Sequence, residues 1–130
     1  MPSSPFQLVP HAFRHLGLVF LVPGVVAPAL PAGFSGGAAY GDLAAGLLAI
    51  AVLVALRYRW RATIPLAWLL TIVGTADLAI ALSHAEAVPY LHAAWYIPTF
   101  AVPVLLVTHA MTLTRLVRRL GVVGRRQAAE

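Results

Sequence analysis

The chain is 130 residues long, 61% of them hydrophobic and 10% charged, and its mean hydropathy is +0.87. Soluble domains are close to half apolar and a quarter charged, so this composition excludes a soluble monomer as the default and also excludes a disordered chain. The formal net charge of +5 comes from nine basic residues, all arginine, against four acids, and the absence of cysteine excludes disulfides and thiolate sites.

Four apolar segments are long enough to form membrane helices. A bilayer core of about 30 Å needs roughly 20 apolar helical residues. The apolar runs are continuous rather than alternating, which favours helices over barrel strands. We therefore predict one all-α domain, an integral membrane bundle of four transmembrane helices that occupies the whole chain. Its expected spans, in chain order, are residues 16–34, 38–56, 64–83 and 88–113, followed by a basic tail at 114–130.

Prolines mark the first and fourth segments. Pro23 and Pro28 lie in the first, and Pro98 and Pro103 in the fourth. Each proline removes a backbone donor and crowds the carbonyl four residues earlier, so we expect both helices to kink. Thr99 is placed to bind a freed carbonyl. The kinks either shape a short bundle or open a cavity between the first and fourth spans.

The arginines predict the orientation of the chain. With four crossings, every arginine falls on one side, which the positive-inside rule makes cytoplasmic, and both termini lie there too. We expect a multi-pass protein of a bacterial inner membrane whose arginines flank the membrane, and no nucleic-acid partner. The arginines precede the first span, join the second to the third, and follow the fourth: Arg14; Arg57, Arg59 and Arg61; and Arg115, Arg118, Arg119, Arg125 and Arg126.

Two carboxyl groups fall inside the predicted spans. Asp42 and Asp77 both lie roughly 6–9 Å below the outer membrane boundary, counted at 1.5 Å per helical residue. An ionisable group at that depth is costly and is a functional candidate by default. Because no Arg or Lys is expected at that depth, Asp77 should be protonated near neutral pH or bonded to His92 or Tyr96. We predict Asp77, His92 and Asp42 as catalytic candidates, and as ligand-binding candidates Tyr40, His84, Trp95 and Tyr96.

Three functions fit this pattern. The first, which we favour, is binding of a lipophilic small molecule in a cavity facing the outer leaflet. Two carboxyls near histidine and tyrosine would also suit acid–base conversion of that molecule, so the sequence leaves open whether the protein is an enzyme. The second is a non-enzymatic accessory subunit, and the third is a small oligomeric proton-coupled transporter. The expected partners are membrane lipid, a lipophilic ligand, and either further copies of the chain or a larger membrane complex.

Metal and haem sites receive little support. A metal site built from His84, His92, Asp77 and Asp42 is an alternative, but no two of these residues have the close spacing of a ligand pair, so they give only a weak metal signal. His92 and His109 would lie about 25 Å apart along one helix and so are too distant to ligate one haem within one chain. We therefore predict no metal site, and the sequence names no cofactor.

One stretch resembles a known class of proteins. It runs from Trp95 through Pro103 to Thr108 and His109, and the segments at 41–43 and 77–78 fit the same pattern. The stretch is similar to small, uncharacterised bacterial membrane proteins with four spans. The resemblance implies the span count and a bacterial inner membrane, and it carries over no activity and no catalytic residue.

Overall fold

The computed structural model describes residues 5–127 and contains no β-strand within them. Long α-helices alternate with 3₁₀ segments and one π-helical turn. The elements, in chain order, are α1 (Pro5–Ala12), η1 (Phe13–Leu21), α2 (Ala32–Arg57), α3 (Thr63–Ser83), η2 (Ala85–Tyr90), η3 (His92–Trp95), the π-helical η4 (Ile97–Ala101) and α4 (Val102–Gln127).

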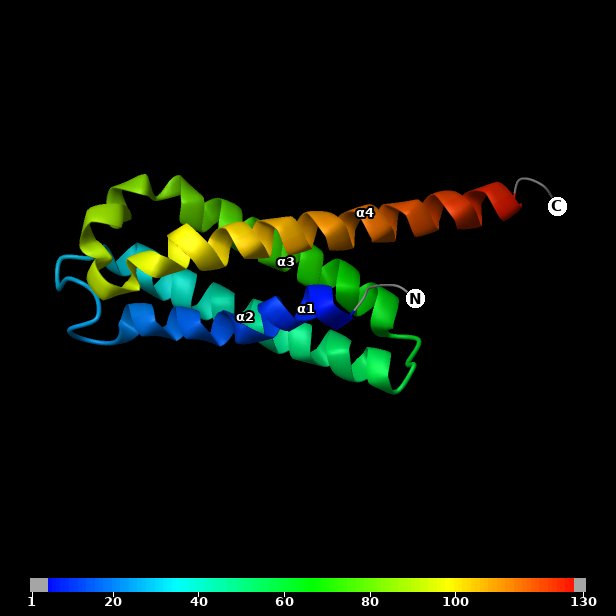
Figure 1. The fold of residues 1–130 in the computed structure, drawn as a ribbon, viewed down its shortest axis with the longest axis horizontal. Coiled ribbons are helices and arrows are strands. Elements are labelled where there is room, and N and C mark those ends of the chain that lie inside the picture. Colours follow the sequence, from blue (N-terminus) through cyan, green and yellow to red (C-terminus); the bar gives the residue numbers. More distant parts are fainter. Residues whose placement is uncertain (1–4, 128–130) are drawn as a thin grey trace.

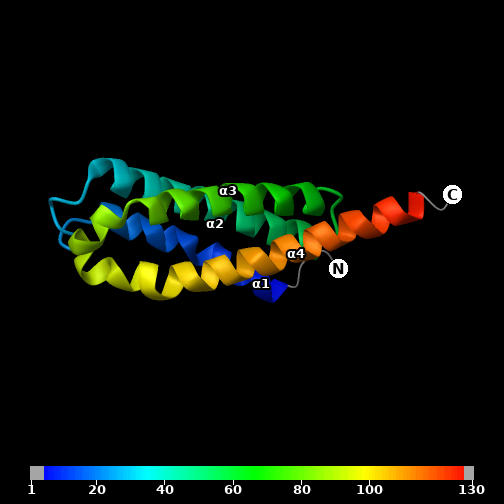
Figure 2. The ribbon, with the colours of Figure 1, turned by 90° about the horizontal axis from the view of Figure 1, so that it is seen from above.

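Four helical stretches lie side by side with alternating direction (Figures 1 and 2). The α1–η1 stretch runs away from the N-terminus, α2 returns, α3 runs out again, and η4 with α4 returns. The turn at 58–62 and both ends of the chain lie at one end of the bundle, where α4 extends past its neighbours. The segments at 22–31 and 84–96 lie at the other end.

The segment predicted as the first span is not a single helix. It is helical only up to Leu21, residues 22–31 form an irregular connection, and α2 begins at Ala32. Prolines explain the break, because Pro23, Pro28 and Pro31 lack the donor that continued helix needs. The first helical stretch instead begins at Pro5, ahead of the predicted boundary.

The second and third predicted spans correspond to α2 and α3, and α2 starts six residues earlier than the predicted residue 38. The fourth is more irregular than predicted. It begins as short 3₁₀ segments and passes through the π-helical η4, which contains Pro98, before α4 continues with Pro103 near its start. The Thr99 hydroxyl donates to the Trp95 carbonyl at 2.9 Å, so this side chain does bind a backbone oxygen beside the proline.

Three helical stretches in the described part of the chain are long and apolar enough to cross a membrane: Ala32–Arg57, Thr63–Ser83 and His92–Arg119. Their length and hydropathy identify a helical membrane protein. The α1–η1 stretch is shorter and carries polar side chains on its buried face, among them His11 and Arg14.

Two apolar cores divide the bundle along its length. One includes Phe20 on η1, Ala38 on α2, Leu78 on α3 and Leu105 on α4. The other lies nearer the chain ends and includes residues of the same four stretches: Leu8, Ala45, Leu70 and Leu116. Along every stretch, a polar or charged residue lies between the two cores. The structure thus places a polar layer between two apolar layers.

Candidate functional site: a buried arginine between two aspartates

Arg14 is the centre of the polar layer. It is 3% exposed, although it lies on the short N-terminal stretch. Its Nε donates to Asp42 Oδ1 on α2 at 2.6 Å, and its Nη2 donates to Asp77 Oδ2 on α3. Its Nη1 donates to the carbonyl oxygen of Gly74, also on α3, at 3.3 Å. One guanidinium therefore ties together three helical stretches, and all three of its nitrogens have acceptors.

Two buried histidines extend this cluster toward the second apolar core. His109 on α4 places Nε2 3.5 Å from Arg14 Nη1. Its ring packs on that of His11, with the ring centres 4.1 Å apart. His11 Nε2 lies 2.8 Å from the Thr108 hydroxyl on α4. The cluster thereby reaches the fourth stretch, so every helical stretch of the bundle contributes to it.

Glycines make room for these side chains. A methyl group on Gly17 would overlap the Asp42 carboxylate, and one on Gly41 would overlap the Asp77 carboxylate. A methyl group on Gly74 would lie 2.5 Å from His109 Nε2 and 2.9 Å from Arg14 Nη1. The charged groups can approach one another only because the backbone facing each of them carries no side chain.

This arrangement corrects two expectations drawn from the sequence. We expected Arg14 at the cytoplasmic boundary with the other arginines, and we expected no cation at the depth of Asp77. Both expectations are wrong, because the helix that carries Arg14 starts at Pro5 and this residue lies inside the bundle. Asp77 is bonded to Arg14 rather than to His92 or Tyr96.

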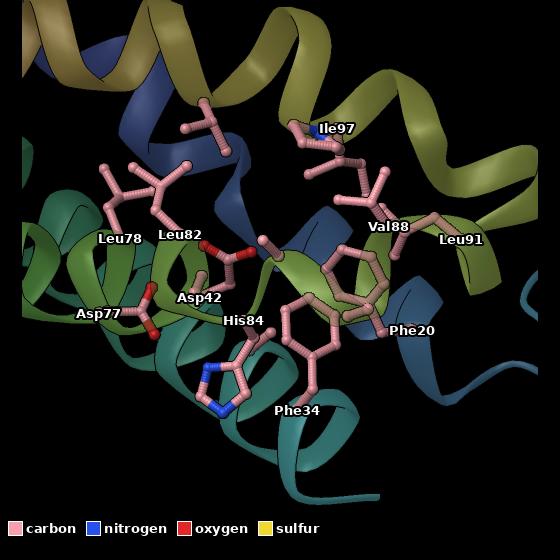
Figure 3. A pocket seen from close by; sticks show the side chains of 16 residues that line it. Phe20, Phe34, Asp42, Asp77, Leu78, Leu82, His84, Val88, Leu91 and Ile97 are labelled. Carbon is pink, nitrogen blue, oxygen red and sulfur yellow. The ribbon is translucent and has the colours of Figure 1, made fainter. Parts of the chain in front are cut away.

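A cavity of about 240 Å³ opens beside the two carboxylates. Asp42 and Asp77 line it together with Phe20, Phe34 and His84, and the rest of the lining is apolar. Figure 3 shows the carboxylates to the left of the two phenylalanine rings. The His84 and Phe34 ring centres are 5.9 Å apart. An elongated apolar molecule in this space would have its polar end at the aspartates.

A second cavity, of about 340 Å³, lies between the first and fourth stretches. Arg14 and Gly17 line it from one side, Tyr96 and Phe100 from the other, and Asp42 lies in its wall as well. A cavity therefore lies between the first and fourth stretches, and whether the prolines cause it stays a prediction.

The predicted site residues divide into three groups, according to the cavity that they line. Asp42 and Asp77 are brought together by Arg14, and His84 shares their cavity. Tyr96 lines only the second cavity. The remaining three are exposed and line neither cavity: Tyr40 on α2, and His92 and Trp95 on η3.

Sequence reasoning missed Arg14, His11 and the facing glycines. The signal for Arg14 was present, because two carboxyls at one depth inside a bundle require a compensating cation. Arg14 is the basic residue closest to the first apolar segment, and that segment contains no basic residue of its own.

Among residues 5–127, no group of three or more histidine, aspartate or glutamate side chains is arranged to hold a metal ion.

Comparison with known families gives one match. The model of a domain of unknown function, DUF8737, matches residues 5–117. The chain belongs to this family. Neither a curated protein nor a solved structure matches it. The DUF8737 match begins where α1 begins and covers all the elements that build the polar cluster, so the cluster lies wholly inside the family domain.

Proposed function

We propose that the protein binds a lipophilic small molecule in the cavity beside Asp42 and Asp77. The observation that carries this proposal is the lining of the cavity, which is apolar except at the two carboxylates and His84. Small-molecule sites in proteins have this composition, a mostly apolar wall with a few polar groups that fix orientation.

The contacts of Arg14 favour one kind of polar end for that molecule. Arg14 does not line this cavity, and its three nitrogens donate to Asp42, Asp77 and Gly74, so a molecule in the cavity meets the aspartates rather than the guanidinium. The carboxylates of Asp42 and Asp77 are acceptors and are each 13% exposed. The bound molecule therefore presents a hydrogen-bond donor or a positive charge to the aspartates.

Binding is tested by filling the cavity. Ala81 on α3 lines it, whereas Ala79 on the same helix is exposed and lines neither cavity. Small molecules extracted from purified Ala81→Phe, Ala79→Phe and unchanged protein are compared by mass spectrometry. A molecule retained by the unchanged protein and by Ala79→Phe, and lost from Ala81→Phe, supports the site. Equal retention by all three proteins refutes it.

We also propose that the chain crosses an inner membrane four times, with both termini in the cytoplasm. The α1–η1 stretch is short, but 3₁₀ geometry rises about 2.0 Å per residue against 1.5 Å in an α-helix. Eight α-helical and nine 3₁₀ residues therefore reach roughly 30 Å, the thickness of a bilayer core. Two groups of arginines, at 57–61 and in α4, support the orientation, and Arg14 takes no part in it. The side chains of Arg125 and Arg126 lie outside the described residues.

Orientation is tested with single cysteines, because the chain has none of its own. Glu86 on η2 and Arg59 between α2 and α3 are exposed at opposite ends of the bundle. In intact cells, a membrane-impermeant thiol reagent should label Glu86→Cys and spare Arg59→Cys, and permeabilisation should make both reactive. The reverse pattern in intact cells would refute the orientation.

A further inference from the structure

The charges of the polar cluster do not balance. Arg14 contributes one positive charge, while Asp42 and Asp77 contribute two negative charges when both are ionised. The three groups lie between two apolar cores, where a net charge is costly because little solvent reaches it. The ionised cluster therefore needs one further positive charge.

The two histidines do not supply that charge in this arrangement. His109 Nε2 faces Arg14 Nη1, which is always a donor, so this nitrogen must be the acceptor of a neutral ring. The Thr108 hydroxyl donates to backbone carbonyls of α4, so its oxygen accepts from His11 Nε2. The Nδ1 atom of His11 is buried without a hydrogen-bond partner in the described structure, which favours a neutral ring there too.

The other titratable group at the cavity is His84, at the end of α3. Its Nδ1 lies 2.9 Å from the Ile80 carbonyl and 3.2 Å from the Ser83 hydroxyl. Its ring packs on Phe34, and no described ion pair joins it to either aspartate. Arg14 is the one arginine of the described residues that forms an ion pair, so no described side chain supplies the missing charge in this arrangement.

We propose that the Asp42–Arg14–Asp77 cluster holds one exchangeable positive charge, taken in turn by a proton on the aspartates and by the cationic head of the bound lipophilic molecule. This inference rests on the proposed function and names its ligand class, a lipophilic monocation. When the cation binds, the proton leaves the carboxylate for solvent, and the cluster stays neutral in both states. Arg14 remains ionised and paired throughout. Such an exchange is the elementary step of proton-coupled transport.

The test uses two probes of one shape. Benzyltrimethylammonium is a monocation, and neopentylbenzene has a carbon atom in place of its nitrogen and is uncharged. Binding of each to the full chain in lipid nanodiscs is measured by calorimetry in two buffers of different ionisation enthalpy, with empty nanodiscs as the blank. The difference between buffers gives the number of protons released for each bound probe.

We expect the cation to release close to one proton where the cluster is protonated, and its apparent Kd to rise tenfold for each unit that pH falls. The neutral probe should bind without releasing a proton. If both probes bind and neither releases a proton, the exchange is wrong and the ligand site stands. If neither probe binds, the proposed binding function fails for this ligand class, and the exchange fails with it.

Variants locate the exchanging group. In Asp77→Asn and in Asp42→Asn one negative charge is lost and Arg14 balances the other, so proton release should fall to near zero and the preference for the cation should disappear. Continued binding of the neutral probe shows that the variant is folded. Unchanged proton release in both variants overturns the assignment to this cluster.

Discussion

Gly41→Ala tests whether the glycines are required for the ion pairs. The added methyl group would lie 2.6 Å from the Cγ atom of Asp77 and closer still to one carboxylate oxygen. The Asp77 side chain cannot move away freely, because the same carboxylate is bonded to Arg14. Overpacking of this kind costs about 1–3 kcal/mol, and displacement of a buried ion-pair partner costs about 3–5 kcal/mol. The better helix propensity of alanine returns about 1 kcal/mol.

We therefore expect Gly41→Ala to lower the free energy of unfolding by about 2–4 kcal/mol, the cost of displacing the Asp77 carboxylate less the gain in helix propensity, or roughly 6–20 °C in midpoint temperature. Thermal unfolding in detergent, followed by circular dichroism, measures it. Gly37→Ala on the same helix is the matched control, since a methyl group there meets nothing within 4 Å. That control should be neutral or more stable. Adding Asp77→Ala should remove most of the effect of Gly41→Ala. Equal stability of the two single variants would refute the reasoning.

Two further substitutions probe the cluster through stability. Arg14→Gln leaves two buried carboxylates without their cation and should cost about 3–5 kcal/mol, whereas Arg57→Gln at an exposed position should change stability by less than about 0.5 kcal/mol; similar midpoints in detergent would contradict the role of Arg14. Thr108→Val removes the acceptor of buried His11 and should cost about 1–3 kcal/mol, while Thr114→Val, whose exposed hydroxyl bonds only its own helix, should be neutral; chemical denaturation compares them, and a neutral Thr108→Val would contradict the His11 contact.

Hydropathy was sufficient to predict α2 and α3. Each is a long apolar run with one carboxyl, and a bilayer selects for such runs with little regard to what surrounds them. The shared depth of Asp42 and Asp77 also followed from counting residues along antiparallel helices. The sequence predicted only that a carboxyl group at that depth needs a partner. It did not predict that one arginine connects the two carboxylates.

The identity of that partner was not predictable from hydropathy. A search for runs of about 20 apolar residues centres each span on the most apolar ones. It therefore placed the first span at 16–34 and left Arg14 outside that span. In the structure the helical stretch instead begins at Pro5 and includes His11. This stretch is less apolar than the predicted span, and the pairing of the buried arginine with two carboxylates compensates for its polar residues. Pairing energies between helices leave no periodic trace in one sequence.

The positions of Tyr40, His92 and Trp95 depend on features that the sequence leaves open. Tyr40 lies two residues from Asp42, and on a helix such neighbours point to different faces. His92 and Trp95 belong to a 3₁₀ segment, and His92 has a positive φ of 43°. An irregular connection of this kind does not follow the helical spacing on which the prediction for both residues relied.

Three glycines around the cluster each face a charged residue on another stretch, and together these contacts form a cycle. Gly17, three residues after Arg14, faces Asp42; Gly41, the residue before Asp42, faces Asp77; and Gly74, three residues before Asp77, faces Arg14. Each of the first three stretches thus supplies one charged side chain and the space for the charged side chain of another stretch. A change at one site alters the constraint at a partner remote in sequence, so substitutions should be inherited in pairs that cross between stretches. Related chains that lose Asp77 are free to gain a side chain at position 41, and that linked variation would identify the members of the family that keep the site.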